Sequence, residues 1–366
     1  MIKNFCILFI SITLFASCNS SDEGEPKVKD SFDRNAMLVN IADNIIVPAY
    51  DDFSSKMTAL KTAGETFTTT PNQVNLDALR TSWLTAYKTW QHIEMFNIGK
   101  ADELQYSFHM NIYPLTVADV ETNISNGVYD LDSANNHDAQ GFPALDYLLY
   151  GVADSDATIL AKYTTDTNKD NYKKYITDVL NKMNTLTTSV VSDFKTQRDS
   201  FVTSTSNTVN SAVNMLINDY IFYYEKGLRA NKIGIPAGIF SATPLPEKVE
   251  GFYKNNVSKE LALEALTAVQ DLFEGKHFSS STVGPSFQQY LEALNGGNIV
   301  AGIKTQFRLA NIEINKLDNS FSTQINTDNS AMTMAYDELQ KVVILLKVDM
   351  LQAFNISVDY VDADGD

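Results

Sequence analysis

Apolar side chains that recur every three or four residues are the strongest constraint on what this chain can fold into. Such stripes run through residues 38–60, 76–90, 176–194 and 332–350. This spacing gathers the apolar side chains on one face of an α-helix. Strands do not alternate with helices along the sequence, so the pattern favours antiparallel helical bundles over an α/β sheet. We therefore predict an all-α protein.

Composition and pattern divide the chain into four parts. We predict a signal peptide at 1–17, a lipidated flexible tether at 18–31, an N-terminal helical bundle at 32–155 and a C-terminal helical bundle at 156–366. Each half begins with a long helix that is followed by an aromatic-rich one. This similarity suggests two four-helix-bundle-like halves related by duplication, with a cleft between them.

The N-terminal segment predicts export and a lipid anchor. Lys3 is followed by an apolar run from Phe5 to Phe15, which is shorter than the roughly 20 residues that span a bilayer. Small residues then precede Cys18, as a lipoprotein signal peptidase requires, and an acidic polar tract follows. We expect an outer-membrane lipoprotein held in the bilayer through Cys18, facing either the periplasm or the cell surface. The alternative is a plain secretory signal whose cysteine is incidental.

The charge and the cysteine content exclude several partners. A net charge of -17 argues against nucleic acid, whose phosphates need a basic patch, and against lying on anionic lipid. The two cysteines are Cys6 and Cys18, so residues 32–366 contain none and form neither disulfides nor thiolate metal sites. With 44% hydrophobic residues, packing is sufficient to stabilise the folded part.

Two segments depart from the helical pattern. Residues 233–246 contain three prolines and two glycines, which predicts an extended loop. Ile356, Val358 and Tyr360 alternate with polar residues, which indicates a short terminal strand.

Four motifs between Ala36 and Gly151 occur in a characteristic order. They are Ile45-Ile-Val-Pro-Ala-Tyr50, Trp83-x6-Trp90-Gln-x2-Glu94-x-Phe96-x2-Gly99, Ile112-Tyr-Pro114 and Gln140-Gly-Phe-Pro-Ala-Leu-Asp-Tyr-Leu-Leu-Tyr-Gly151. With these motifs the chain resembles the imelysin family of bacterial envelope proteins. The second half resembles the family more thinly, through Glu225, Lys226, Pro236, Gly238, Val249-Glu250 and Ser258, and so does the ending Asp362-Ala-Asp-Gly-Asp366.

The resemblance implies two helical bundles with a site in the cleft between them. The family signature, Gly-x-His-x-x-Glu, has been interpreted as a metallopeptidase motif. Here Gly141 is kept, but Pro143 stands at the histidine position and Asp146 at the glutamate position. Proline has no ligand atom, so the motif is degenerate and a peptidase of this type lacks one candidate ligand.

Four carboxylates are candidate ligands for iron or another divalent or trivalent cation, because hard cations prefer oxygen donors. They are Glu94, Asp146, Glu225 and Glu250. Each has a structural alternative: a hydrogen bond at a helix end for Glu94, an ordinary helix-surface position for Asp146, and a pair with Arg229 for Glu225. Trp90, Pro143, Tyr147 and Arg229 are the candidate cleft residues. His92 and Glu94, two residues apart on a helix, are not expected to share an ion.

Three functions follow, and the sequence leaves them open. The first is a binding lipoprotein that takes iron or a small ligand in the cleft, working with iron-uptake components, as the resemblance implies. The second is a metal-dependent peptidase with a degenerate motif. The third is a helical lipoprotein that binds a peptide, a glycan or a protein partner.

Overall fold

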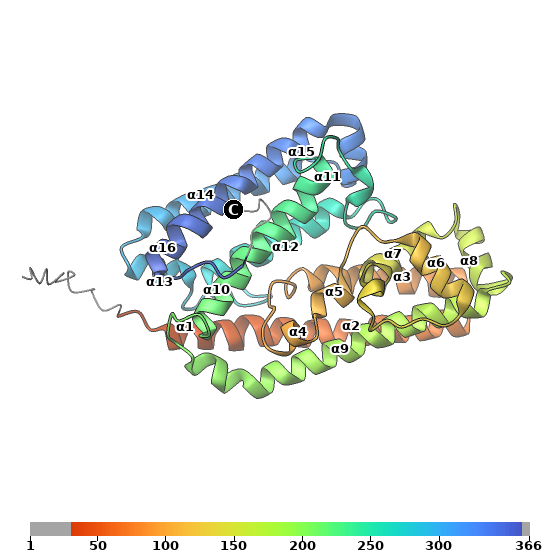
Figure 1. The fold of residues 1–366 in the computed structure, drawn as a ribbon, viewed down its shortest axis with the longest axis horizontal. Helices are drawn as coiled ribbons and strands as arrows, with labels where there is room; N and C mark the ends of the chain where they lie inside the picture. Colours follow the sequence, from red (N-terminus) through yellow and green to blue (C-terminus); the bar gives the residue numbers. More distant parts are fainter. Residues whose placement is uncertain (1–30, 361–366) are drawn as a thin grey trace, which may run out of the picture. The chain divides into compact units, whose positions relative to one another are not determined.

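The computed structural model describes residues 31–360, in which every regular element is helical (Figure 1). Within this range the extended pairing is limited to one isolated bridge between Lys276 and Val283. The all-α prediction is confirmed. The signal peptide, Cys18, most of the tether and the ending Asp362–Asp366 lie outside the described residues.

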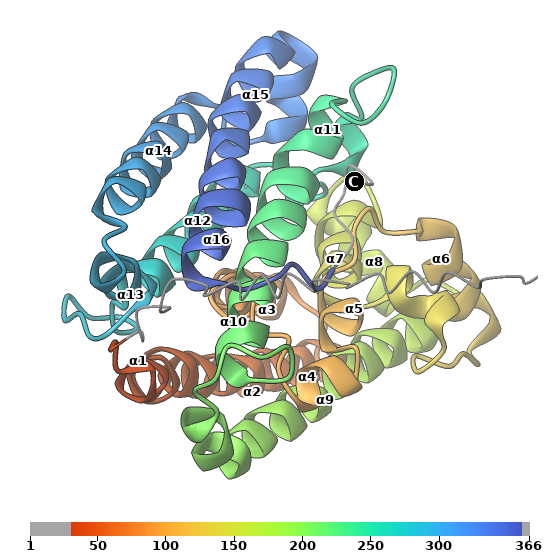
Figure 2. The same cartoon turned by 60° about the vertical axis from the view of Figure 1, so that its left-hand side comes forward.

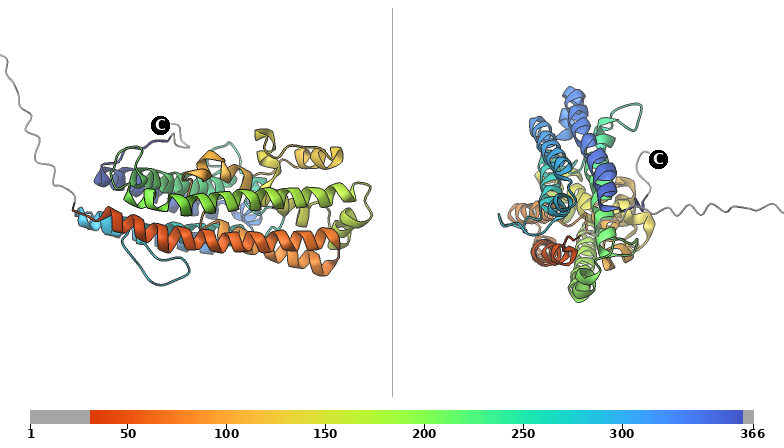
Figure 3. Two further views of the ribbon diagram at one scale, coloured as in Figure 1. Left: turned by 90° about the horizontal axis from the view of Figure 1, so that it is seen from below. Right: turned by 90° about the vertical axis from the view of Figure 1, so that its left-hand side faces the viewer.

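The first group of helices is built on the predicted stripes. Its elements are α1 (Arg34–Asn40), η1 (Ile41–Ile46), α2 (Val47–Thr69), α3 (Gln73–Trp90), α4 (Lys100–Glu103), α5 (Tyr106–Met110), α6 (Val117–Asn126), η2 (Ala134–Ala139), α7 (Gly141–Asp146), η3 (Tyr147–Gly151), α8 (Asp156–Thr164) and α9 (Lys169–Thr203). Helix α2 packs along both α3 and α9, and α2 and α9 lie side by side in Figure 3. Phe53, Leu60 and Trp83 are fully buried between these helices, as the 3.6-residue period requires.

The second group of helices covers residues 212–354. Its elements are α10 (Ala212–Phe222), η4 (Tyr223–Gly234), α11 (Ile235–Ala237), η5 (Pro246–Lys248), α12 (Ser258–Glu274), α13 (Phe287–Ala293), α14 (Gly297–Lys316), α15 (Phe321–Ile344), η6 (Leu345–Met350) and α16 (Leu351–Phe354). Helix α15 packs against α14 and the π-helical η4, and these helices lie together in Figure 2.

The two groups share contacts within one body. Helix α12 packs on α3 as well as on α14, and from Phe32 on the described residues form one compact unit. Helix α9, which a boundary at residue 155 assigns to the C-terminal half, packs along α1 and α2. The boundary and the duplication remain predictions.

Two local predictions need correction. Residues 233–237 are helical rather than extended, because the helix of η4 continues through Pro236 to Ala237 and the φ that proline fixes is a helical one. The helix ends at Gly238, and residues 238–245 form the predicted loop. Residues 356–360 form no strand. Their backbone is bound instead by the Asn218 side chain, which donates to the Ser357 carbonyl and accepts from the Asp359 amide.

No helix in residues 31–360 combines the length and the apolar character needed to cross a bilayer.

Candidate functional site

The signature helix α7 is anchored by a glycine that no other residue replaces easily. Gly141 has φ +74°, and a Cβ at this position would lie 2.2 Å from the Met110 carbonyl oxygen. The following residue, Phe142, stacks flat on Tyr87 of α3 at 4.4 Å between ring centroids. Pro143 lies in the first turn, buried, and has no polar side-chain atom.

Asp146 joins the signature helix to the loop before α12. Its Oδ2 accepts the Tyr253 amide at 2.8 Å and its Oδ1 accepts the Lys254 amide at 2.9 Å. Burial raises the pKa of this carboxyl to about 7, although both backbone hydrogen bonds favour the charged form. Asp146 is buried rather than on a helix surface, and both oxygens are committed to the backbone.

Tyr147 belongs to a different contact. Its hydroxyl donates to Glu121 Oε1 at 2.6 Å, and Tyr172 donates to the other oxygen of the same carboxylate at 2.7 Å. Burial raises the pKa of Tyr147, so the phenol stays protonated and acts as a donor. Tyr147 therefore ties α6 to η3, the segment that continues from the signature helix.

Glu94 lies in the turn that follows α3. Its Oε1 accepts from Asn111 Nδ2 at 3.0 Å and its Oε2 accepts from the Tyr223 hydroxyl at 3.2 Å. The Lys232 ammonium is 3.8 Å from Oε2. Burial raises the pKa of Glu94, while Lys232 acts in the opposite direction. The side chain keeps 13% of its surface exposed, so this carboxylate is accessible at one edge.

Glu250 lies deeper and shares the partners of Glu94. Its Oε2 is 2.6 Å from the Lys232 ammonium, and its Oε1 accepts from Asn111 at 2.9 Å and from Gln91 at 3.1 Å. Lys232 is 1% exposed and Glu250 2%. The two carboxylates are thus bridged by one ammonium and one amide, a network that we call the Lys232 network (Gln91, Glu94, Asn111, Tyr223, Lys232, Glu250).

Two buried polar atoms beside this network lack partners among the described residues. They are the Gln91 carbonyl oxygen and the Trp90 indole nitrogen. The Trp90 N–H still lies close enough to Glu94 to favour its charged form, although outside hydrogen-bond geometry. Unpaired buried polar atoms are rare and often mark functional sites.

Glu225 and Arg229 form a separate buried network within the second group of helices. The Arg229 guanidinium lies 3.4 Å from Glu225 Oε1 and donates to the Tyr336 hydroxyl at 2.6 Å. Lys347 lies 3.6 Å from the other Glu225 oxygen. The expected pairing of Glu225 with Arg229 is present, but it is buried rather than on the helix surface.

The four predicted metal ligands therefore do not converge. Glu94 and Glu250 lie together, whereas Asp146 and Glu225 each belong to a different set of partners. Among residues 31–360, no group of three or more His, Cys, Asp and Glu side chains is arranged to hold a metal ion. The pair that does converge already shares one ammonium, Lys232, which lies 2.6 Å from Glu250 and 3.8 Å from Glu94. These residues do not fit a four-carboxylate iron centre.

A cleft of about 550 Å³ opens beside Glu94, between the segment after α3 and the α10–η4 helix. Its charged lining residues are three carboxylates, Glu94, Asp102 and Asp219, and one ammonium, Lys226. Burial raises the pKa of Asp219 to about 8, and the neighbouring Asp359 and Asp102 add to this effect. Phe222 is 42% exposed along the same wall. We call this cavity the Glu94 cleft.

Sequence reasoning missed Asn111, Tyr223, Lys232 and Asp219. Lys232 carries no clear signal of its own, because the segment from Leu228 to Ile233 also contains Arg229 and Asn231. Asn111 directly precedes the Ile112-Tyr-Pro114 motif. Tyr223 and Lys232 both lie on η4, and π-helical segments are rare and frequent at functional sites.

Fold and cleft together define a class of all-helical proteins in which two groups of helices border a shared polar cleft. Comparison with known proteins gives the family. The imelysin family model (peptidase M75) matches residues 46–346, and the chain belongs to this family.

Individual relatives are distant. Iron-regulated protein A of Synechococcus elongatus is 26% identical over 160 residues, which is 43% of this chain and 42% of that protein. The match thus spans less than half of the relative.

Two crystal structures share the fold. An imelysin-like protein from Psychrobacter arcticum superposes with a TM-score of 0.71 at 18% identity, covering 89% of this chain and 97% of the other. A protein described as an iron-regulated protein A precursor, from Parabacteroides distasonis, gives 0.71 at 16% identity, covering 88% and 95%.

Proposed function

We propose that this protein binds a small cationic ligand in the Glu94 cleft and that this binding serves iron acquisition. The observation that carries the proposal is the Glu94 carboxylate, which is exposed at one edge to a cleft of about 550 Å³ and held from behind by Asn111 and Tyr223. Such concave cavities with a few fixed polar groups are the usual form of small-ligand sites.

The charge of the cleft favours a cation. Glu94 and Asp102 face one lysine, Lys226, while Asp219, whose pKa burial raises to about 8, is mostly protonated at pH 7. The whole chain carries a net charge of -17. The aromatic side chains of Phe108 and Phe222 add apolar surface on the walls. An iron ion in a hydrated or partly chelated form, or an organic cation, matches this lining better than an anion does.

The link to iron comes from the relatives. Two of them carry the name iron-regulated protein A, one by sequence and one by fold. We propose that the chain has a related role as an outer-membrane lipoprotein anchored through Cys18, acting beside iron-uptake components. A peptidase role has less support, because Pro143 offers no ligand atom and both Asp146 oxygens accept backbone amides.

Titration calorimetry on the purified full chain tests the proposal, with ferrous ion under anoxic conditions and with ferric ion delivered from nitrilotriacetate. We expect binding of at least one form, weakened about tenfold or more by Glu94→Gln, because a hydrogen bond to a charged group is worth about 1.5–3 kcal/mol. Glu65→Gln, a change of an exposed carboxylate on α2, is the matched control and should leave binding unchanged. If neither form of iron produces heat, the iron assignment is wrong.

A further inference from the structure

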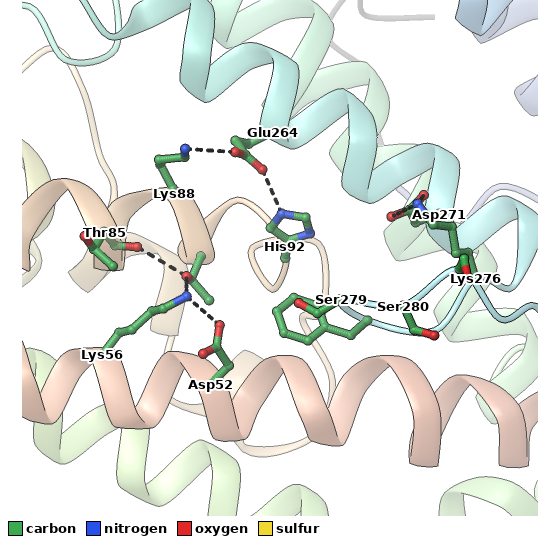
Figure 4. Close-up of a pocket in the computed structure, with 13 residues that line it drawn as sticks. Asp52, Lys56, Thr85, Lys88, His92, Glu264, Asp271, Lys276, Ser279 and Ser280 are labelled. Atoms are coloured by element: carbon green, nitrogen blue, oxygen red, sulfur yellow. Dashed lines mark hydrogen bonds and ion pairs between the residues drawn. The ribbon is translucent and has the colours of Figure 1, made fainter.

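A second hollow lies away from the Glu94 cleft. It measures about 730 Å³ and is bordered by α2, α3, α12 and the loop after α12 (Figure 4). The two cavities share no lining residue. In the turn after α3, His92 lines this hollow and Glu94 lines the other cleft. We call this second cavity the His92 hollow.

The charges of the His92 hollow are balanced and already paired. Lys56 lies 2.6 Å from Asp52, and Lys276 lies 3.1 Å from Asp271. Lys88 and His92 both contact Glu264, at 3.2 Å and 3.0 Å, as Figure 4 shows. The hydrogen bond from His92 lowers the pKa of Glu264, and Lys88 adds to this, so that carboxyl stays charged. An ionic ligand would have to compete with these pairs.

Hydrogen-bonding capacity nevertheless remains on the walls. Among residues 31–360, the Lys56 ammonium bonds only Asp52 and Thr89, so one of its three N–H donors is available. The Asp271 carboxylate bonds only Lys276 and keeps acceptor capacity. The Ser280 hydroxyl accepts from the Thr282 amide and has its own O–H to donate. Both donor and acceptor capacity therefore remains on the walls of a cavity whose lysines and carboxylates are equal in number.

The loop that closes the hollow is fixed before any ligand arrives. The Phe278 amide donates to the Asn44 carbonyl of η1 at 2.8 Å. Asn40 donates to the carbonyls of Gly275 and Pro285, at both ends of the loop. Phe278, half-buried, packs against the His92 ring at 5.5 Å between centroids and is the aromatic side chain of the lining. A preformed wall reduces the entropy that binding must overcome.

We propose that the His92 hollow binds a neutral polyhydroxylated ligand, namely a carbohydrate. Sugar hydroxyls both donate and accept, so they match the lysine, carboxylate and serine groups of the lining without separating an ion pair. The apolar C–H face of a sugar ring packs on an aromatic side chain, the role assigned to Phe278. A volume of about 730 Å³ lies within the roughly 300–1,000 Å³ range of ligand pockets, with room for a short oligosaccharide.

Calorimetric titration of the full chain with maltotriose, cellotriose and mannotriose tests this proposal, with citrate and spermidine as charged probes. We expect at least one trisaccharide to bind and neither charged probe to compete for it. Phe278→Ala and Asp271→Asn should each weaken binding about tenfold, the effect of one lost net interaction. Glu94→Gln should leave sugar binding unchanged, which separates this result from the fate of the iron proposal.

Matched controls keep the outcome interpretable. Phe240→Ala removes a partly exposed aromatic side chain from another loop, and Asp337→Asn removes an exposed carboxylate from α15. Both should bind sugar like the unchanged protein, and thermal unfolding should show that all variants are folded. The proposal is overturned if no trisaccharide binds, if citrate or spermidine displaces the sugar, or if folded Phe278→Ala and Asp271→Asn bind it normally.

Discussion

A single lysine, Lys232, stabilises the two carboxylates, Glu94 and Glu250, that lie in the core beside the Glu94 cleft. Lys232 is the cationic partner that Glu94 and Glu250 share, at 3.8 Å and 2.6 Å, and it is almost completely buried. Buried charges are tolerated only when they are paired and hydrogen-bonded. Asn111 and Gln91 satisfy the remaining carboxylate lone pairs of Glu250.

Lys232→Met should therefore lower the free energy of unfolding by about 3–5 kcal/mol at pH 7, since it leaves two buried carboxylates without a cation. The loss should be smaller at pH 5 than at pH 7, because burial raises the pKa of Glu94 and lower pH favours the neutral form of this carboxyl. Urea unfolding at the two pH values measures both effects. Lys316→Met, at an exposed lysine of α14, is the control. Equal losses at the two lysines would contradict this account of the network.

At the scale of elements, a carboxylate adds to the helix packing that holds the two groups of helices together. Asp146 on the signature helix receives two backbone amides from the segment that leads into α12. Helix α12 itself packs on α3 of the first group. Because the carboxylate is buried, its ionisation affects how firmly the two groups are held.

The pKa of Asp146, raised from 3.8 to about 7, makes stability depend on pH in a defined direction. Between about pH 4 and pH 7 the folded state holds a proton that the unfolded state has released, so the contribution of Asp146 to stability falls as the pH rises. Asp146→Asn does not titrate. The stability of the unchanged protein relative to this variant should therefore decline from pH 4 to pH 7.

Chemical denaturation across that range measures the difference, with Asp337→Asn as the control for an exposed carboxylate. A difference that stays constant, or that grows with pH, would show that Asp146 does not have a raised pKa in the folded protein.

At the scale of the whole molecule, the lipid anchor is the prediction with the widest consequences. Cys18 follows an apolar run and a pair of small residues, which is the sequence that lipoprotein processing requires. Cys18→Ser should move the protein from the membrane fraction to the soluble fraction, with loss of metabolic labelling by palmitate. Cys6→Ser, within the predicted signal peptide, should change neither. Continued membrane association of Cys18→Ser would contradict lipidation at this site.

The sequence predicted the architecture better than the site, for a physical reason. Apolar periodicity is a local property, so the stripes that contain Phe53, Leu60 and Trp83 could be identified as helix faces without knowing their partners. The failures were also local in origin. The proline-rich segment from Ile233 was expected to be extended, yet residues 233–237 are helical, because the φ that proline fixes is compatible with a helix.

The candidate site depends on which acid meets which base across long sequence separations. Glu94 and Glu250 were both singled out, but their grouping depends on Lys232 and Asn111, which no local pattern marks as partners. Asp146 and Glu225 were singled out equally, and the structure commits them to backbone amides and to Arg229. A carboxylate in the sequence does not indicate which cation or hydrogen-bond donor it will contact in the fold. The predicted cluster of four carboxylates therefore could be tested only with the three-dimensional structure.

The short turn after α3 contributes to the walls of both cavities, because His92 lines the His92 hollow and Glu94 lines the Glu94 cleft. A ligand that displaces this turn on binding in one cavity changes the shape of the other cavity. Thermodynamic reciprocity then requires that each occupant alter the other's affinity by the same factor. Two chemically unrelated ligands could thus compete or cooperate without touching each other. The coupling would pass through the five residues of backbone from Gln91 to Met95.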